Sequence, residues 1–221
     1  MKPVIYLPEI EKLFCNIGPC TSACLSMHQL SESLGNAVDA RDGLTHNHSQ
    51  QVAVISRLIA LAMGFNTKQA DIIHITGHLH DIGKIGIPDD VLKKSGVFTE
   101  QDWKWMKRHP EIGAKILSPV KVFKSDGAIW EIVLYHHERF DGSGYPSRLK
   151  GRDIPIGARI VAVADTLSAL IQDRAYRKGR SFDDAVEEIR RHSDSQFDPL
   201  IVKIFIEIND DIRQGLEGIW S

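Results

Sequence analysis

The chain lacks an apolar run of the roughly 18 residues that a membrane-spanning helix requires. Its first residues, MKPVIYLPEIEKLF, also lack the basic end, long apolar stretch and small-residue cleavage site of a signal peptide. Cysteine is scarce: Cys15, Cys20 and Cys24 are an odd number, which argues against a disulfide framework, and an iron–sulfur cluster would need a fourth thiolate. These absences predict a cytoplasmic protein with reduced thiols.

An excess of charge of one sign is also missing, since 27 Lys and Arg residues stand against 29 Asp and Glu residues, a formal net charge of −2. Proteins that bind nucleic acid through bulk electrostatics usually carry a strong basic excess, so we expect no DNA or RNA partner, and no membrane partner either. An anionic ligand must then be held by a local site. With 43% hydrophobic and 25% charged residues, the 221-residue chain has the composition of a globular protein with a sizeable core.

Strand patterns with tight turns are scarce, whereas apolar residues recur at helical spacing along almost the whole chain. We expect one helix over about residues 21–41 and a second over 46–64, which should stop at Gly64. Apolar residues share one face of each: Leu30, Leu34 and Val38 in the first helix, and Val52, Ile55 and Ile59, facing inward, in the second.

Residues that favour helix N-termini mark the starts of the other helices. These are Thr67, Thr99 with Asp102, Pro110, Asp126, Ser181 with Asp184, and Asp198 with Pro199, which should open the last helix. The helix capped by Thr67 should end near Gly83, and residues 138–154, dense in Gly, Asp, Ser and Pro, should form an irregular loop. We therefore predict an all-α fold, with a helical domain over residues 42–221 and an N-terminal arm and helix over residues 1–41.

Polar side chains interrupt the apolar faces of these helices. His48 shares the inward face of the second helix, while His136 and His137 continue the apolar face of the helix expected after Asp126. Asp165 lies within the apolar stretch PIGARIVAVADTLSAL, where a buried carboxylate costs several kcal/mol unless it is protonated, paired or metal-bound. Taken singly, each residue has an ordinary explanation, a hydrogen-bonded core histidine or an aspartate paired with arginine.

The ordinary explanation weakens because the chain also places His80 and Asp81 at a helix end and His109 just before Pro110. Five histidines and two aspartates then form a set of nitrogen and oxygen ligands without thiolates, which suits iron, manganese or zinc. A carboxylate can bridge two such ions, and a binuclear centre can activate a hydroxide for phosphoryl transfer.

A second pair of histidines, His74 and His78, has the i,i+4 spacing of zinc ligands on a helix. The stretch HITGH lacks the glutamate of the HExxH metalloprotease pattern. Two interpretations stay open, a pair of ligands or residues that pack and support other ligands, and the second is favoured.

Two long motifs resemble those of the HD-GYP family: HDIGKIGIPDDVL at residues 80–92 and HHERFDGSGYP at residues 136–146. The likeness covers about residues 42–205, through His109-Pro110, IPIGARIVAVAD and a closing Phe-Asp-Pro at residues 197–199. This family is a branch of the HD-domain metal-dependent phosphohydrolases that degrade cyclic dinucleotides, chiefly cyclic di-GMP. The resemblance implies an HD-domain helical bundle around a metal site.

Matched position by position, the resemblance implies two divalent ions, iron or manganese, with zinc, magnesium or nickel as alternatives. Asp81 would bridge them, and the ligands are His48, His80, Asp81, His109, His136, His137 and Asp165. Lys84 matches the lysine of the HDxGK signature, and Arg174 and Arg177 match residues that contact substrate phosphates. Tyr145 belongs to the Gly-Tyr-Pro triplet, which either stiffens the loop behind the histidine pair or contacts the substrate or a partner.

The chain also departs from the family pattern. Leu44 stands where some members have a glutamate that holds a third ion, so we predict a binuclear centre unless His46 or Asp42 substitutes. Gln51 stands where the family often has arginine, and Ala175 where it often has proline. The receiver or sensor domain that usually accompanies this family is not present in the sequence, so regulation would come from the N-terminal arm or another protein.

From the resemblance we expect a phosphodiesterase that hydrolyses cyclic di-GMP to linear pGpG, or onward to GMP, through a metal-bridging hydroxide. Asp81 and Lys84 would be catalytic, and Lys84, Arg174, Arg177 and Tyr145 would contact the substrate. Two alternatives stay open. One is a non-catalytic module that binds the nucleotide or docks onto GGDEF-domain proteins, and the other is hydrolysis of cyclic GMP-AMP. The oligomeric state is open as well, a homodimer being one option.

Overall fold

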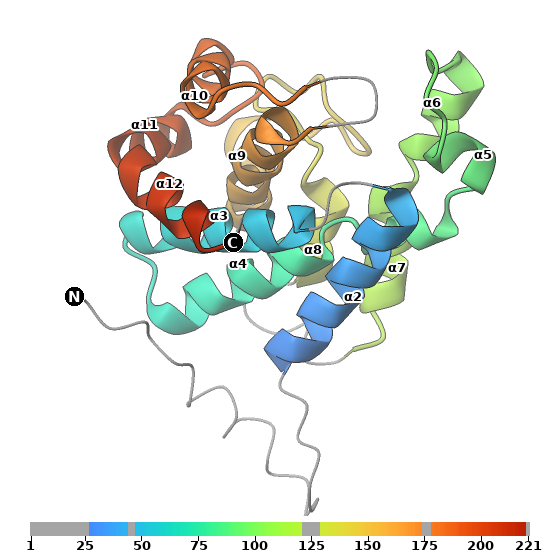
Figure 1. The fold of residues 1–221 in the computed structure, drawn as a ribbon, viewed down its shortest axis with the longest axis horizontal. Helices are drawn as coiled ribbons and strands as arrows, with labels where there is room; N and C mark the ends of the chain where they lie inside the picture. The colour runs from blue at the N-terminus through green and yellow to red at the C-terminus, as the bar shows by residue number, and fades with distance from the viewer. Residues whose placement is uncertain (1–26, 44–46, 121–128, 174–177, 220–221) are drawn as a thin grey trace, which may run out of the picture.

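The computed structural model describes residues 27–43, 47–120, 129–173 and 178–219. Within these ranges the chain is helical and contains no strand, only an isolated bridge between Ser193 and Phe197, which confirms the all-α prediction. The described helices are α2 (Met27–Asp42), α3 (His48–Ala62), α4 (Thr67–Leu79), α5 (Asp89–Leu92), α6 (Glu100–Met106), α7 (His109–Leu117), α8 (Ile129–Tyr135), α9 (Ile156–Ile171), α10 (Phe182–Arg191), α11 (Pro199–Glu207) and α12 (Asn209–Glu217) (Figure 1). Two short 3₁₀ helices are η1 (Ile82–Gly86) and η3 (Gly151–Asp153). None of the described helices combines the length and the apolar character needed to cross a membrane.

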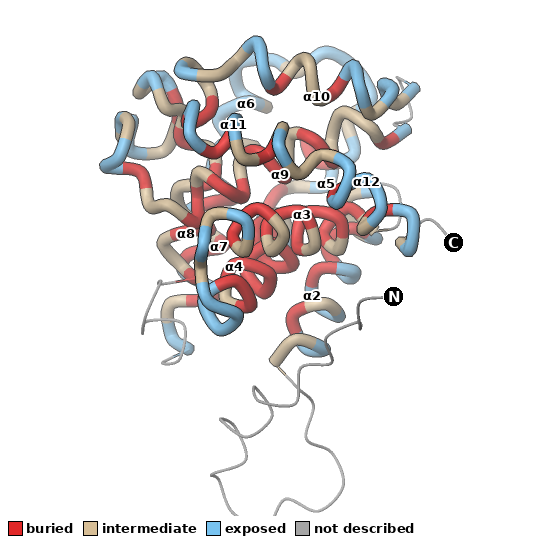
Figure 2. The backbone as a smooth tube through the Cα atoms, turned by 90° about the vertical axis from the view of Figure 1, so that its left-hand side faces the viewer, coloured by how far each residue is buried: buried red, intermediate tan, exposed pale blue. Residues whose placement is uncertain are grey.

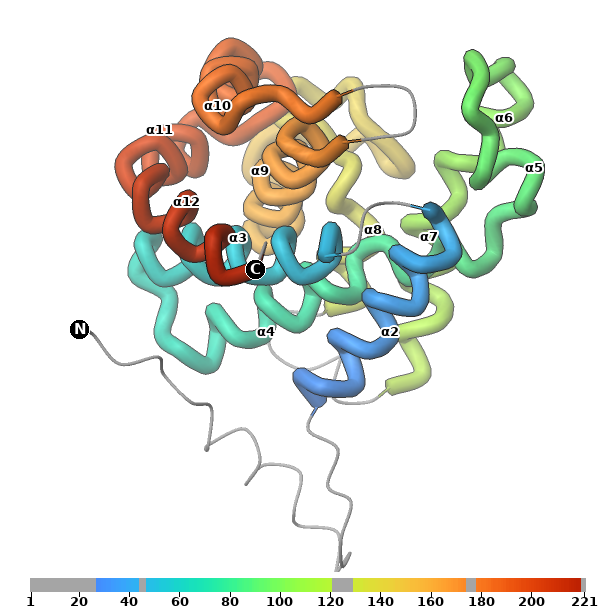
Figure 3. The backbone as a smooth tube through the Cα atoms, in the orientation of Figure 1, coloured from blue at the N-terminus to red at the C-terminus, as the bar shows by residue number. Residues whose placement is uncertain are grey.

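Helix α3 is the central element of the bundle, and it packs against α2, α4, α9, α11 and α12. Its inward face is the one predicted from the sequence, because Val52, Ile55 and Ile59 are fully buried. Figure 2 shows α3 and α4 as the most continuously buried part of the chain. In Figure 3, α10, α11 and α12 lie to one side of this pair, and α5 and α6 lie to the other.

Most of the predicted helices are present, with corrections at two of them, the first being α4. Asn66, not Thr67, caps α4, because the Asn66 side chain accepts from the Gln69 backbone N–H while the Gln69 side chain accepts from the Asn66 N–H. Helix α4 ends at Leu79 rather than near Gly83, and η1 follows it. The start predicted at Asp126 falls outside the described residues.

The C-terminal end of the chain gives the second correction. Asp198 caps α11 as predicted, its side chain accepting from the Leu200 backbone N–H at 2.8 Å. Helix α11 is not the last helix, because the chain turns at Ile208 and continues as α12. Ile212 and Leu216 of α12 are buried in the main core, so this helix completes the covering of α3.

Helix α2 packs differently from the apolar face that its leucines suggest. Leu30 and Leu34 are exposed, whereas Val38 is buried as predicted, together with Ser31, Gly35 and Asp39. A Cβ at Gly35 would lie 2.6 Å from the His78 carbonyl oxygen, so only glycine permits this approach of α2 to α4.

The buried carboxylate of Asp39 explains why this face of α2 can be polar. It accepts hydrogen bonds from the backbone N–H of Ser49 at 2.9 Å and from the Ser49 hydroxyl at 2.8 Å. Ser49 lies in the first turn of α3, where backbone N–H groups have no partner within the helix. Helix α2 therefore fixes the start of α3, the turn that carries His48.

The close packing of α3 on α4 yields a prediction. A Cβ at Gly77 would lie 2.5 Å from the Ala53 Cα and 2.7 Å from the Ala53 nitrogen. We expect Gly77→Ala to lower the free energy of unfolding by about 1–3 kcal/mol, because backbone atoms cannot yield to the extra methyl group. Urea unfolding followed by circular dichroism measures this change.

Gly215→Ala in α12 is the matched control. A Cβ there would meet only side-chain ends, Leu58 Cδ1 at 3.3 Å and Val54 Cγ1 at 3.5 Å, so the gain in helix propensity of up to about 1 kcal/mol should leave this variant neutral or stabilised. Equal destabilisation of the two variants would contradict the proposed packing constraint.

Candidate metal centre

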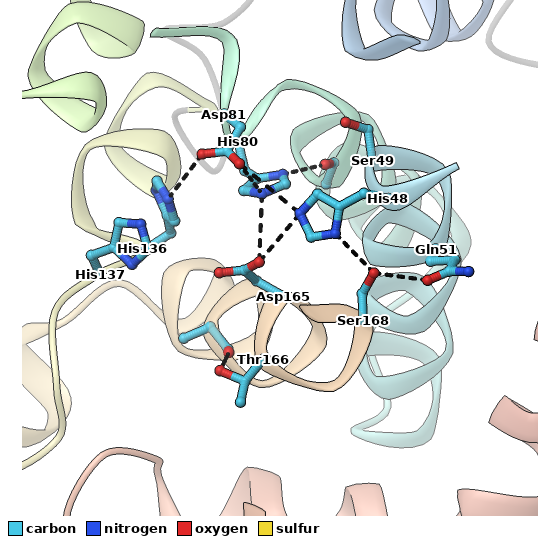
Figure 4. A network of polar contacts seen from close by, with 12 residues as sticks. His48, Ser49, Gln51, His80, Asp81, His136, His137, Asp165, Thr166 and Ser168 are labelled. Atoms are coloured by element: carbon cyan, nitrogen blue, oxygen red, sulfur yellow. Dashed lines mark hydrogen bonds and ion pairs between the residues drawn. The ribbon is translucent and has the colours of Figure 1, made fainter. Parts of the chain in front are cut away.

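The structure brings together all seven residues that the sequence marks as metal ligands. Six of them lie at or just beyond helix ends, and Asp165 lies within α9: His48 begins α3, His80 and Asp81 follow α4, His109 begins α7, and His136 and His137 follow α8. Most of these side chains are buried, but His137 and Asp165 are only partly so. Figure 4 shows how the labelled members of the group point toward a common space from different helices. The roles of these residues as ligands stay predictions.

Asp81 lies at the middle of the group, and its two carboxylate oxygens face different histidines. Oδ2 is 3.2 Å from Nε2 of His80 and 4.0 Å from Nε2 of His48. Oδ1 is 3.2 Å from Nε2 of His109 and 4.0 Å from Nε2 of His136. The candidate ligand atoms accordingly form two clusters that share only Asp81.

The other side of each cluster is closed by a further residue. Asp165 Oδ1 lies 3.3 Å from Nε2 of His48 and 3.9 Å from Nε2 of His80. The Nε2 atoms of His137 and His109 are 3.1 Å apart. Ligand atoms bound about 2.1 Å from one ion lie about 3.0–3.4 Å from one another, so both clusters have nearly the spacing of a metal site.

Three of the histidines are oriented by the same local hydrogen bond. The Nδ1 atoms of His80, His109 and His136 each lie 2.7 Å from the backbone carbonyl oxygen three residues earlier, in Gly77, Met106 and Val133. A carbonyl oxygen can only accept, so Nδ1 carries the proton. The lone pair of each neutral ring is then on Nε2, which faces the shared space.

His48 is oriented by a chain of side chains. Its Nδ1 lies 2.9 Å from the Ser168 hydroxyl, which donates to Oε1 of Gln51 at 2.8 Å. The Gln172 amide also donates to this Oε1, at 2.9 Å. Because the Ser168 proton is directed to Gln51, the hydroxyl oxygen accepts from His48, and the Nε2 lone pair of His48 faces the carboxylates.

The Nε2 lone pairs of these histidines and the carboxylate oxygens of Asp81 and Asp165 face the same space, as the ligands of a metal ion would. Lone pairs of imidazole nitrogens that face carboxylate oxygens repel them unless a proton or a cation lies between. Nε2 of His80 is buried and has no hydrogen-bond partner among the described atoms, although it lies beside Asp81 and Asp165. The donor set therefore fits two divalent ions, with His48, His80 and Asp165 on one side of Asp81 and His109, His136 and His137 on the other.

The electrostatics of the protein atoms agree with this fit. Burial alone would raise the pKa of Asp81, but Lys84 and His80 outweigh burial and hold this pKa well below its usual value. Burial would lower the pKa of His80, but Asp81 and Asp165 raise it to about 9. Burial and neighbouring histidines lower the pKa of His136, and burial and His109 lower that of His137 to about 3, so these rings are neutral and available as ligands.

Lys84 lies beside the centre and is held by two carboxylates. Its Nζ is 2.8 Å from Oδ2 of Asp81 and 2.6 Å from Oδ2 of Asp42 at the end of α2. Burial would lower the pKa of Lys84, but the two aspartates raise it, so Lys84 stays charged. The Asp42 carboxylate, considered from the sequence as a ligand for a third ion, is thus paired with Lys84, while Leu44 and His46 fall outside the described residues.

A cavity of about 310 Å³ opens next to the centre, on the side of its less buried members. Its lining includes Lys107, His137, Tyr145 and Asp165. The Tyr145 ring stacks on His137 with 4.9 Å between the ring centroids, and Lys107 Nζ lies 5.4 Å from the Tyr145 ring centroid. The predicted phosphate contacts Arg174 and Arg177 fall outside the described residues.

The loop that carries Tyr145 is fastened by Glu138, whose carboxylate accepts from the backbone N–H groups of Ser147 at 2.6 Å and Leu149 at 3.1 Å. The peptide bond between Tyr145 and Pro146 is cis. As predicted, residues 138–154 are mostly irregular, with η3 as the exception. The loop therefore contacts His137 through the ring of Tyr145 and also lines the cavity.

The sequence reasoning missed the residues that orient His48. Ser168 lies three residues after Asp165, and Gln51 lies three residues after His48. Each pair shares a helix face, so a second polar residue at i,i+3 on an apolar face was the available signal. His74 and His78 do not join the candidate metal centre.

Known proteins share this sequence pattern and this fold. The sequence profile of the HD domain family matches residues 32–201. A 3'3'-cGAMP-specific phosphodiesterase of Vibrio cholerae is 38% identical over 207 residues, which cover 94% of this chain and 40% of the relative. A cyclic di-GMP phosphodiesterase of Thermotoga maritima is 40% identical over 190 residues, covering 84% of this chain and 50% of the relative. The chain spans half or less of the length of these curated relatives.

Solved structures show the same fold. A cyclic GMP-AMP-specific phosphodiesterase of V. cholerae superimposes with a TM-score of 0.68 at 18% identity, over 88% of this chain and 51% of that one. An HD-GYP-type protein of Bdellovibrio bacteriovorus gives a TM-score of 0.63 at 20% identity, over 84% of this chain and 64% of that one. At these identities the likeness concerns the fold alone.

The hydrogen bond between His48 and Ser168 yields a prediction. We expect Ser168→Ala to weaken metal binding by about 10–100-fold, because His48 loses the acceptor that keeps its Nε2 directed inward. Competition against a chelator of known affinity, with folding checked by circular dichroism, measures this change.

Ser56→Ala is the matched control. Ser56 is a fully buried serine of α3, and its hydroxyl has no hydrogen-bond partner among the described residues. Its substitution should leave metal affinity unchanged, and equal affinities of Ser168→Ala and the unaltered protein would contradict the role given to Ser168.

Proposed function

The chain belongs to the HD domain family, in its HD-GYP branch, and we propose that it hydrolyses a phosphodiester bond of a cyclic dinucleotide at a binuclear metal centre. The observation that carries the proposal is the position of Asp81, whose two oxygens face two separate clusters of histidines. A shared carboxylate of this kind is what a two-ion hydrolytic centre requires. The curated relatives, named as phosphodiesterases of cyclic di-GMP or of cyclic GMP-AMP, support the substrate class.

We propose that His48, His80 and Asp165 hold one ion, that His109, His136 and His137 hold the other, and that Asp81 bridges them. When bound, the two ions would lower the pKa of a water molecule and stabilise negative charge on phosphodiester oxygens. The set of five histidines and two aspartates suits iron or manganese, with zinc, magnesium and nickel as alternatives. The residues of the chain would hold the ions, since each histidine whose Nδ1 is hydrogen-bonded is fixed in one orientation.

The remaining groups act on the substrate. Lys84 stays protonated between Asp42 and Asp81, so it places a positive charge beside the centre that can stabilise a phosphate oxygen. Burial raises the pKa of Tyr145, so its phenol stays protonated and is able to donate a hydrogen bond in the cavity. Arg174 and Arg177 complete the proposed set of phosphate contacts.

For the substrate we propose cyclic di-GMP, with linear pGpG as the first product and GMP as the product of a second cleavage. In each cleavage a water oxygen forms a bond to phosphorus while the bond from phosphorus to the 3′ oxygen breaks. Cyclic GMP-AMP is the alternative substrate, favoured by the 38% identity to the relative named for it. A non-catalytic role in binding cyclic di-GMP or docking onto GGDEF-domain proteins, in a monomer or a homodimer, is the competing outcome.

One experiment tests the activity. Protein purified without oxygen and loaded with iron or manganese is incubated with a panel of cyclic dinucleotides, and the products are separated by chromatography. We expect a linear dinucleotide from the unaltered protein and a loss of more than about 10³-fold in Asp81→Ala, because neither ion retains its shared ligand. Elemental analysis of the same samples measures the metal content.

The matched control for this test is His192→Ala, which removes a half-exposed histidine just after α10 whose Nδ1 lies 3.0 Å from the Glu188 carbonyl oxygen. It should keep full activity. Turnover by Asp81→Ala at the rate of the unaltered protein would exclude the mechanism. Tight binding without any product would favour the non-catalytic role.

Tyr145 allows the two interpretations of the Gly-Tyr-Pro triplet to be separated. We expect Tyr145→Phe to keep the stacking on His137 and the metal content but to raise KM about tenfold, through loss of one hydrogen bond to the substrate. Tyr145→Ala should also lower metal content, because His137 loses the ring behind it. Unchanged KM in Tyr145→Phe would leave loop support as the only role.

A further inference from the structure

A second cluster of histidines lies between α2 and α4, outside the candidate metal centre. His28 is in the first turn of α2, and His74 and His78 are one turn apart in α4. One ring nitrogen from each residue lies within 4.8 Å of those of the other two. The rings of His28 and His74 are stacked with centroids 4.9 Å apart, and His78 meets both edge-on, at 5.4 Å and 4.9 Å.

The cluster is separate from the candidate metal centre because of helix geometry. Each residue of an α-helix is rotated by about 100° from the one before it, so positions two residues apart point in nearly opposite directions. His78 accordingly faces α2, while His80 faces Asp81. The structure shows no ring contact between the three histidines and those of the candidate metal centre in the part of the chain that it describes.

The polar atoms of the cluster are poorly satisfied by protein alone. The Nε2 atoms of His28 and His74 are 2.8 Å apart, so one of them must carry the proton that the other accepts. His78 is 2% exposed, and neither of its ring nitrogens has a hydrogen-bond partner among the described atoms. A buried polar group without a partner destabilises a fold, so such groups are rare unless a ligand meets them.

The protonation state of the cluster suits a cation. Burial and the neighbouring His28 lower the pKa of His74 to about 4, so this ring is neutral at physiological pH and its lone pair is available. The Nδ1 of His74 has no partner at hydrogen-bond distance, although the Ala53 backbone favours its protonated form. A carboxylate oxygen of Glu32 lies 4.0 Å from Nδ1 of His28, beyond hydrogen-bond distance but on the same side of the ring as the partner that usually orients a metal-binding histidine.

We propose that His28, His74 and His78 bind one divalent transition-metal ion of the zinc class, at a site separate from the candidate metal centre. Three imidazoles without thiolates suit zinc, cobalt or nickel, and the i,i+4 pair on α4 has the usual spacing of two such ligands. His28 is 30% exposed, which leaves a route from solvent and room for a fourth ligand. This inference does not depend on the proposed phosphodiesterase activity.

The site would have a structural role. It joins the start of α2 to α4, whereas the other end of α2 is joined to the candidate metal centre through Asp42 and Lys84. The polar contacts of Asp39 with Ser49 lie between these two ends. A bound ion would therefore hold α2 along its whole length against α3 and α4.

The test is a comparison of metal content. The unaltered protein, His28→Gln and the control His192→Gln are equilibrated with zinc, desalted and measured by elemental analysis. We expect His28→Gln to contain one equivalent of zinc per chain less than the other two, and the same difference in proteins that also carry Asp81→Asn. Equal zinc content in all three proteins would overturn the proposal.

Two further measurements keep the result unambiguous. Anomalous diffraction at the zinc edge from crystals of the unaltered protein should give a peak about 2.0–2.1 Å from one ring nitrogen of each histidine, whether or not His28→Gln folds. Absence of a peak there would overturn the proposal. The second measurement compares the absorption spectra of cobalt-loaded unaltered protein and cobalt-loaded His28→Gln. We expect the substitution to remove only weak ligand-field bands. Loss of a thiolate charge-transfer band would instead indicate binding by the cysteines at positions 15, 20 and 24 and would contradict the three-histidine site.

Discussion

The architecture depends on two carboxylates, the buried Asp81 and the partly buried Asp165, that lie among the histidines of the candidate metal centre. An unpaired buried carboxylate is too costly for a domain whose net stability is only about 5–15 kcal/mol. The surrounding helices therefore have to bring compensating groups to the same place, and they do so through their ends. His48 begins α3, His80 follows α4, His109 begins α7 and His136 follows α8.

Helix ends suit this task because their backbone groups are incompletely bonded. Three of the histidines donate from Nδ1 to the carbonyl oxygen three residues earlier, so a carbonyl near the end of a helix or turn fixes the ring and directs Nε2 outward from that element. In His48 the partner of Nδ1 is instead the Ser168 hydroxyl, which comes from α9. One rule of orientation therefore serves four ligands from four elements.

The sequence predicts most of this fold because helices are local. The inward face of α3 follows from the spacing of Val52, Ile55 and Ile59, and polar residues on such faces, His48 and Asp165, mark the site directly. The cap at Asn66 rather than Thr67 was missed because adjacent residues are both good caps and only the reciprocal bond with Gln69 separates them.

Contacts between elements that are far apart in the chain could not be predicted from the sequence. Leu30 and Leu34 suggest an apolar packing face for α2, yet Gly35 and Asp39 make the contact, because a close approach to His78 and a bond to Ser49 matter more than apolar area. The link from Ser168 to His48 spans 120 positions, and nothing in the local pattern states it. The role of His74 and His78 depended in the same way on a third residue, His28, 46 positions before His74.

Helix α2 shows how these long-range contacts combine. Along its length it meets α4 at His28, the start of α3 at Asp39 and the lysine of the HDxGK signature at Asp42. The carbonyl oxygens of Lys84 and Ile87 also accept from the guanidinium of Arg41, so α2 fixes both the side chain and the backbone of η1. A displacement of α2 would then remove one of the two carboxylates that hold Lys84 and leave its charge paired with Asp81 alone. A single helix therefore joins the histidine contacts at its start to the charge beside the candidate metal centre.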